Sequence, residues 1–147
     1  NMLTSSNDVR SVLEHHPEVI YQYRALLNAR GFTEVPTQGK GIIVSGYRDE
    51  AYNERIKGAS DSAHRYANAI DIHVGSFAEQ LEWARTANDI FARVGIYPEK
   101  TIIHVDLMPY GENYKHGKRY WIGTKSGYSS FDTFEELERQ AQTYFTS

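Results

Sequence analysis

Three of the six histidines lie where a metal ion or a reacting group could be held. His73 comes two residues after Asp71, and His104 comes two residues before Asp106. His64 precedes this pair of patterns and lies in a polar stretch of the chain. Two imidazole nitrogens and one carboxylate oxygen, with water in the fourth position, are typical of catalytic zinc. Such a zinc lowers the pKa of its water and polarises a carbonyl, which is the chemistry that amide hydrolysis needs.

The same spacings also have a purely structural explanation. Short His and Asp patterns arise by chance, and buried His–Asp pairs often only satisfy each other's hydrogen bonds. His73 in particular is interpreted either as a framework histidine or as a group that stabilises a tetrahedral intermediate. The remaining three histidines lie among polar residues and are interpreted as surface side chains: His15, His16 and His116.

Alternation of apolar and polar residues predicts the strands that carry these groups. Over residues 69–74, Ala69, Asp71 and His73 share one face of the expected strand, opposite its isoleucines and valine. Over residues 102–107, His104 and Asp106 likewise share one face. Further short strands are expected at residues 41–45 and 119–122, and His64 is expected on a loop.

Helix signals flank the expected strands. A helix is predicted from Pro17 to a stop at Gly31, and Ser76 with Glu79 forms a capping box for a second one. The apolar spacing extends this second helix through Phe91 and Val94 to Gly95, and Asp132 with Glu135 predicts a capping box for a C-terminal helix. The pattern indicates an α+β domain in which helices pack on a small, mostly antiparallel sheet.

Composition indicates the number of domains and argues against several classes of function. The 147 residues, of which 40% are hydrophobic and 24% charged, are typical of one globular domain. The net charge of -3 disfavours a nucleic-acid-binding surface, and no apolar run approaches the ~18 residues that span a bilayer. Cysteine is absent, so His and carboxylate groups would have to hold any metal. Residues 1–16 are interpreted as a tag remnant and an N-terminal extension without a recognisable secretion signal.

Three ordered motifs resemble those of a known peptidase family. The chain carries S-G-Y-R ending at Arg48, then S-A-H ending at His64 with Ala69 and Asp71, then I-H-V-D ending at Asp106. The zinc D-alanyl-D-alanine carboxypeptidase family, peptidase family M15, carries S-G-Y-R, S-x-H-x-x-G-x-A-x-D and H-x-D segments in this order. The chain is similar to its small single-domain branch over about residues 42–122. The resemblance implies the fold that this family shares with the hedgehog signalling domain.

The resemblance also implies roles for individual residues. It implies a zinc ion bound by His64, Asp71 and His104. It places Arg48 near the site, where a guanidinium fork is suited to a substrate carboxylate or carbonyl, although residue type alone favours a surface salt bridge. Ser62 is expected either to hydrogen-bond near the metal or substrate or to serve its own turn.

The general base is the least defined part of the expected site. Many family members have an acid three residues before the last histidine, where this chain has Thr101. Asp106 is the candidate base because strand parity puts it on the face of His104, and the alternative is that it only orients His104. Glu99 is a weaker candidate. Ala67 stands where the family usually has a glycine, which removes no ligand.

Aromatic residues follow the last motif and are candidates for the wall of a substrate groove. Tyr110 and Trp121 are the predicted substrate contacts, together with Tyr114 and Tyr120. Aromatic residues more often complete a core or a surface edge, and that alternative applies to each of them.

The resemblance therefore predicts a zinc metallopeptidase that hydrolyses an amide bond in peptidoglycan stem peptides or cross-links, as a carboxypeptidase or an endopeptidase. Its partner would be a peptidoglycan peptide and not nucleic acid, and the substrate class implies a periplasmic or extracellular location. The alternative is a non-catalytic module of the same fold that binds zinc and peptidoglycan. A metal-free interaction domain would require all three motif matches to be accidental.

Overall fold

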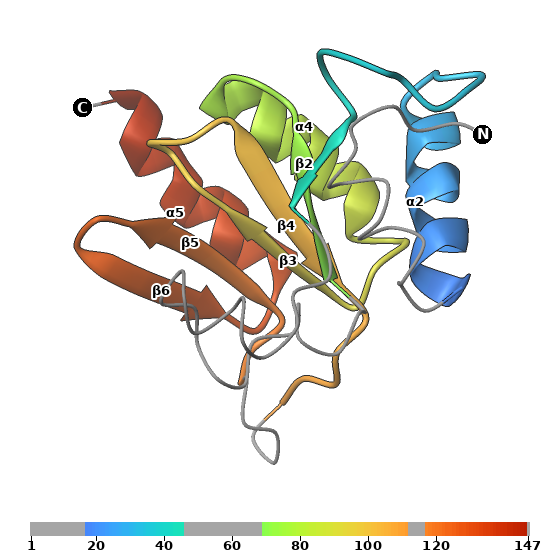
Figure 1. Cartoon of the computed structure of the whole chain (residues 1–147). Coiled ribbons are helices and arrows are strands. Elements are labelled where there is room, and N and C mark those ends of the chain that lie inside the picture. The colour runs from blue at the N-terminus through green and yellow to red at the C-terminus, as the bar shows by residue number, and fades with distance from the viewer. Residues whose placement is uncertain (1–16, 46–68, 112–116, 147) are drawn as a thin grey trace, which may run out of the picture.

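One sheet and three helices make up the part of the chain that the computed structural model describes, residues 17–45, 69–111 and 117–146 (Figure 1). No helix among these residues is long and apolar enough to cross a membrane. In chain order the elements are α2 (Pro17–Ala29), β1 (Ile43–Ser45), β2 (Ala69–His73), α4 (Phe77–Ala87), β3 (Arg93–Ile96), β4 (Ile102–Asp106), β5 (Tyr120–Thr124), β6 (Gly127–Phe131) and α5 (Phe134–Thr146).

The six strands lie in the order β1-β2-β4-β3-β5-β6. All neighbouring pairs are antiparallel except β3 and β5, which are parallel. β4 is therefore central and lies between β2 and β3 (Figure 1). The expected α+β class with a small, mostly antiparallel sheet is confirmed.

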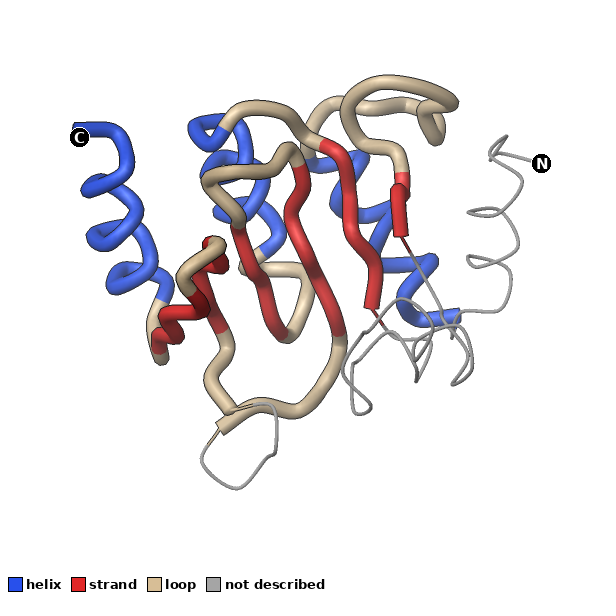
Figure 2. The backbone as a smooth tube through the Cα atoms, turned by 60° about the vertical axis from the view of Figure 1, so that its left-hand side comes forward, coloured by secondary structure: helices blue, strands red, loops and turns tan. Residues whose placement is uncertain are grey.

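The helices cover one face of this sheet (Figure 2). α4 packs on β3 and β4, α5 packs on β5 and β6, and α2 contacts α4. This arrangement leaves the other face of the sheet to polar and aromatic side chains, as described below for the candidate site.

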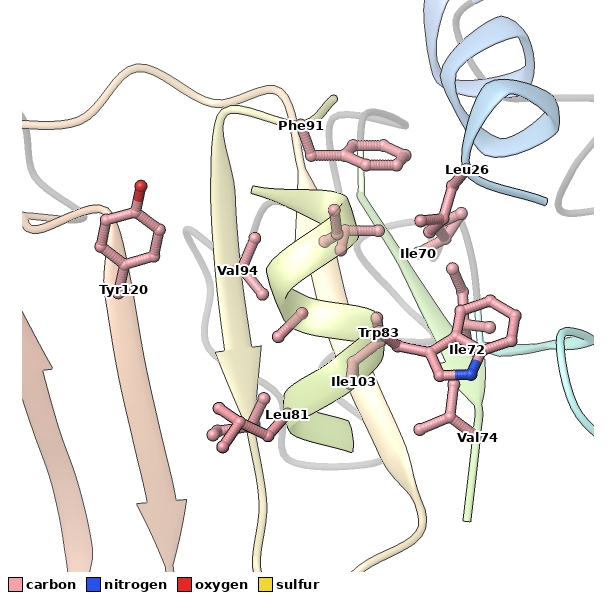
Figure 3. Close-up of a cluster of buried hydrophobic side chains, with 14 of the residues drawn as sticks. Leu26, Ile70, Ile72, Val74, Leu81, Trp83, Phe91, Val94, Ile103 and Tyr120 are labelled. Carbon is pink, nitrogen blue, oxygen red and sulfur yellow. The ribbon is translucent and has the colours of Figure 1, made fainter. Parts of the chain in front are cut away.

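The hydrophobic core fills the space between the sheet and the helices (Figure 3). Every second residue of the central strands points into it and has no exposed surface, as Ile70, Ile103 and Val105 show. Trp83 and Leu81 enter the core from α4. Each such side chain contributes on the order of 1.5–3 kcal/mol through its burial, so this face holds the sheet and the helices together.

Several local signals are confirmed. Ser76 Oγ accepts the N–H of Glu79 at 3.3 Å, while Glu79 Oε1 accepts the N–H of Ser76 at 3.2 Å, which is the predicted capping box. The predicted first helix begins at Pro17 as expected. The strands predicted at residues 41–45, 69–74, 102–107 and 119–122 are β1, β2, β4 and β5.

The predicted extent of the second helix is wrong. α4 ends at Ala87, and the N–H of Asn88 caps it by donating to Ala84 O. Asn and Asp have low helix propensity, and residues 88 and 89 are Asn and Asp. Phe91 and Val94 do lie in the core, but they reach it from a turn and from β3. Their spacing matched a helix only by coincidence.

The C-terminal region brings two smaller corrections. The strand β6 was not predicted, because its sequence G-Y-S-S-F is largely exposed and shows no clear apolar alternation. The N-cap of α5 is Thr133 and not Asp132: Thr133 Oγ1 accepts the N–H of Glu136 at 3.2 Å, and Glu136 Oε1 accepts the N–H of Thr133 at 3.1 Å. The capping box lies one residue later than predicted.

Candidate active site

The central strands place four ionisable side chains next to one another on the face away from the helices. Asp71 in β2 lies opposite His104 in β4. Asp106 in β4 lies opposite Arg93 in β3. Residues that lie opposite each other in a sheet project to the same face, and intervening residues such as Ile103 project into the core. Strand parity and strand register together therefore build this cluster.

His104 is held by carboxylates at both of its ring nitrogens. Its Nδ1 lies 3.0 Å from Asp71 Oδ1, and its Nε2 lies 2.7 Å from Asp106 Oδ2. Only 8% of the residue is exposed. This burial by itself lowers the pKa of His104, but the hydrogen bonds and negative charges of Asp106 and Asp71 outweigh it and raise the pKa to about 9.

Asp106 has no exposed surface, and its oxygens are fully used. Oδ1 accepts from Arg93 Nε at 2.9 Å and from the N–H of Met108 at 3.0 Å. Oδ2 accepts from Arg93 Nη2 and from His104 Nε2, each at 2.7 Å. Burial favours a raised pKa for Asp106, but the hydrogen bonds and positive charges of His104 and Arg93 outweigh it and lower the pKa. A carboxylate accepts at about four positions, so Asp106 has none left for a water molecule.

Trp121 forms an aromatic wall beside this cluster. Its ring centroid lies 5.1 Å from that of His104, and Arg93 Cζ lies 4.9 Å from the centroid of its ring. The indole lies on Gly95, where a Cβ would come within 2.2 Å of the ring. The indole Nε1–H donates to Tyr97 Oη at 3.0 Å, which fixes the orientation of the ring. The absence of a side chain at Gly95 is what allows the indole to reach His104.

The imidazole of His104 and the carboxylate of Asp71 are chemically suited to bind a zinc ion. Asp106 in its ionised form only accepts hydrogen bonds, so Nε2 of His104 carries the hydrogen. Nδ1 then faces the carboxylate of Asp71, and two acceptors in contact are stable only with a proton or a cation between them. Zinc binds one imidazole nitrogen and one carboxylate oxygen readily, and a ligating histidine usually donates its other N–H to a carboxylate or carbonyl. Asp71 and His104 therefore suit two ligand positions, with Asp106 behind them.

Similarity to known proteins decides the family. The family model described as Peptidase M15 matches residues 1–106 of the 147, which is well over half of the chain. The chain belongs to the M15 peptidase family. Members of this family are hydrolases of the metallopeptidase class and generally depend on zinc. No curated protein matches the sequence.

Apart from Tyr110, the predicted site residues of this M15 peptidase fall into two groups. The structure brings together four of them on one face of the sheet: Asp71, His104, Asp106 and Trp121. Three others lie outside the described residues: Arg48, Ser62 and His64. Within the three described segments, no group of three or more acidic or histidine side chains is arranged to hold a metal. The described residues thus supply only the pair Asp71 and His104 toward a zinc site.

Of the three tyrosines of the expected groove wall, Tyr114 lies outside the described residues, and the other two differ in their positions. Tyr110 is 44% exposed, and Arg119 Cζ lies 5.3 Å from the centroid of its ring. Tyr120 points into the core, where its ring meets Phe134 edge-on at 5.6 Å. Because side chains alternate along β5, Trp121 faces the site while Tyr120 faces the helices. Tyr120 is therefore a core residue and not part of a groove wall.

Two further candidates from the sequence have their own partners. Thr101, which stands where many family members have an acid, places its Oγ1 3.1 Å from Nδ1 of His73. This contact favours a framework role for His73. Glu99 lies in the loop between β3 and β4, and its Oε1 accepts the N–H of Lys125 at 2.9 Å.

Three residues that shape the site were not predicted from the sequence: Arg93, Gly95 and Tyr97. All three lie on the same face at two-residue spacing, while Val94 and Ile96 between them are buried. That alternation was visible in the sequence, but the extended helix prediction concealed it. Burial, followed by the negative charge of Asp71, raises the pKa of Tyr97, so its hydroxyl remains a neutral partner for the indole.

Proposed function

We propose that this M15 peptidase uses zinc to hydrolyse an amide bond in the peptide part of peptidoglycan, as a carboxypeptidase or an endopeptidase of the D,D or L,D type. The observation that carries the proposal is the pairing of Asp71 with Nδ1 of His104 at 3.0 Å, while Asp106 holds Nε2 of the same ring. A histidine that ligates zinc usually donates its other ring N–H to a carboxylate or carbonyl, as Nε2 can do here to Asp106. The peptidoglycan substrate, and with it a periplasmic or extracellular location, is supported by the family resemblance.

Three residues would hold the zinc ion. Asp71 and His104 lie side by side on β2 and β4, and the S-x-H motif supports His64 as the third ligand. A bound zinc would polarise the scissile carbonyl and supply a water molecule of lowered pKa.

Asp106 has a positioning role in this proposal. Its buried carboxylate fixes the ring of His104 through Nε2 and leaves Nδ1 directed at Asp71. Because its four acceptor positions are taken by Arg93, Met108 and His104, the geometry favours this role over that of general base. The sequence left open whether Asp106 is the general base or only orients His104, and we assign it the orienting role.

The substrate would lie along the polar face of the sheet beside Trp121. The indole is partly exposed and adjacent to His104, so it can contact the peptide next to the scissile bond. The family motif supports Arg48 as the group that binds a substrate carboxylate or carbonyl, since a guanidinium offers two parallel N–H donors. Ser62 and Tyr110 complete the proposed substrate contacts.

Zinc content tests the metal site directly. The wild-type protein and the variants His64→Ala and His104→Ala are dialysed against metal-free buffer and measured by elemental mass spectrometry. One zinc per chain is expected in the wild type, and its loss is expected in both variants. A wild-type protein that holds no zinc even after zinc is added back would refute the metal site.

Hydrolysis of peptidoglycan fragments tests the activity separately. The zinc-loaded wild type should release new amino groups, which are quantified by amine labelling, and mass spectrometry of the products identifies the bond that is cut. His104→Ala should release none while it remains folded by circular dichroism. Full activity in His104→Ala would refute this mechanism.

A second candidate is a non-catalytic module that binds zinc and peptidoglycan. The observation that favours it is Thr101, which contacts His73 at the position where many family members have an acid. Together with the saturated carboxylate of Asp106, it leaves the described residues without an obvious proton acceptor. This candidate predicts that zinc and peptidoglycan fragments bind while no amino groups are released.

A further inference from the structure

We propose that Arg93 is a positioning residue for the zinc ligand His104 and acts on it through Asp106. The inference rests on the proposed zinc-dependent function and extends it to a residue of β3. It starts from a continuous chain of contacts that runs from Arg93 to Asp106, from Asp106 to His104 and from His104 to Asp71.

The contact between Arg93 and Asp106 fixes the plane of the carboxylate. Nε donates to Oδ1 at 2.9 Å and Nη2 donates to Oδ2 at 2.7 Å, which is a two-point contact. The two side chains are only 7% and 0% exposed, so water does not compete for them. A carboxylate held at two points cannot rotate, and Oδ2 therefore stays directed at Nε2 of His104.

A second contact fixes Arg93 relative to His104. The indole of Trp121 lies close to both groups: its ring centroid is 4.9 Å from Arg93 Cζ and 5.1 Å from the centroid of the His104 ring. The guanidinium is planar and stacks on an aromatic ring in a way that an ammonium group does not. The stacking thus holds the guanidinium in the orientation in which its fork meets Asp106, and the directed contact with His104 runs through Asp106.

Zinc affinity measured by competition with a chelator distinguishes this role from a merely structural ion pair. Arg93→Lys keeps the charge but removes the fork and the stacking. Replacement of a group that orients a ligand typically weakens metal binding about 10–100-fold, and we expect about a tenfold loss for Arg93→Lys. The visible spectrum of the cobalt-substituted protein should shift as well, because the ligand geometry changes.

Arg85→Lys is the matched control. Arg85 also binds a carboxylate, that of Glu138, but it does so at the exposed contact between α4 and α5. The same chemical change there should leave zinc affinity and the cobalt spectrum as in the wild type. If Arg93→Lys also binds zinc as tightly as the wild type, the inference is wrong.

Combination with Asp106→Asn tests whether Arg93 acts through Asp106. Asp106→Asn alone should weaken zinc binding, and Arg93→Lys added to it should cause little further loss. If the two losses multiply in full, Arg93 does not act through Asp106 and the inference is overturned.

A second double variant keeps the test decisive if Arg93→Lys alone does not fold. Arg93→Met with Asp106→Asn leaves no unpaired buried charge. It should bind zinc as Asp106→Asn does, and a further tenfold loss would also contradict the inference.

The outcome for the wild type separates this inference from the proposed function. A wild-type protein without zinc refutes both the proposed metal site and the role of Arg93. A wild type that binds zinc and hydrolyses peptidoglycan fragments, together with an Arg93→Lys variant of unchanged affinity, refutes only the role of Arg93.

Discussion

The two faces of the central strands are held by different kinds of interaction, although they share one backbone. On the face toward the helices, Ile103 and Val105 of β4 meet other apolar side chains and have no exposed surface. On the other face, His104 and Asp106 of the same strand meet charged partners at 2.7–3.0 Å. Both faces are largely buried around β4, so burial does not distinguish them. Their difference lies in the kind of interaction that each face requires.

The comparison shows why one face tolerates change better than the other. Apolar packing is non-directional and roughly proportional to the area removed from water, so its cost varies gradually with the volume lost. Charge-assisted hydrogen bonds depend on distance and angle, and an unpaired buried charge costs more than the bond itself. Substitutions on the core face should therefore lower stability alone, whereas substitutions on the site face should change metal binding as well.

Asp106→Ala should have the largest effect, because it acts on both properties. It leaves Arg93 buried without its carboxylate partner and removes the acceptor for His104 Nε2. We expect the free energy of unfolding to fall by about 3–5 kcal/mol in urea titrations. Zinc affinity should fall at least as far as in Asp106→Asn. A variant with wild-type zinc affinity would contradict the division between the two faces.

Ile103→Ala probes the other face of the same strand. Its side chain is fully buried among the residues under α4, so its truncation leaves a cavity. We expect the free energy of unfolding to fall by about 2–5 kcal/mol, measured by chemical denaturation. Zinc affinity at a temperature where the variant is folded should match that of the wild type. A strong loss of zinc affinity would show that the two faces are coupled.

Gly95→Ala tests the approach of Trp121 to the sheet. The added Cβ would lie 2.2 Å from the indole, so the ring must move away from the strand. Overpacking of this kind costs about 1–3 kcal/mol of stability, and zinc affinity should decrease because His104 loses its neighbour. In a Trp121→Ala background the same substitution should cost much less. An equal cost in both backgrounds would mean that the indole is not the obstacle.

Thr133→Ala should have the smallest effect. Thr133 lies far from the site residues along the chain. Thr133 Oγ1 accepts the N–H of Glu136 at the start of α5. Loss of an N-cap typically costs about 1 kcal/mol, visible as a lower thermal midpoint. Thr143→Ala, an exposed position in the same helix, is the control and should leave the midpoint nearly unchanged. Zinc affinity and hydrolysis should stay at wild-type values in both variants. A change in zinc affinity or in hydrolysis would contradict a role for Thr133 that is limited to capping α5.

Much of the fold could be predicted because its signals are local. The two-residue period placed Asp71 on one face of β2 and His104 with Asp106 on one face of β4, and the structure confirms those faces. The capping box at Ser76 and Glu79 was equally clear, since it depends on neighbouring residues alone. The family motifs were also readable, and the Peptidase M15 match confirms the family.

The errors arose where two signals overlapped. Phe91 and Val94 continued the helical spacing of α4, yet Asn88 ends that helix and Val94 belongs to β3. This misassignment hid the partners of the site, because a helix over residues 93 and 95 would not pair with the strand that carries His104. β6 was missed because an exposed edge strand has little apolar alternation to detect.

The sequence by itself determined which side chains share a face of each strand, because that follows from the geometry of a single extended chain. Only the tertiary structure decided that Asp71 lies opposite His104, that Arg93 hydrogen-bonds to Asp106, and that Trp121 lies on Gly95. These contacts join segments far apart in the chain, and the order and register of the strands set them. The physical reason is that the hydrophobic pattern specifies a buried face for every strand but does not specify which other strand pairs with it.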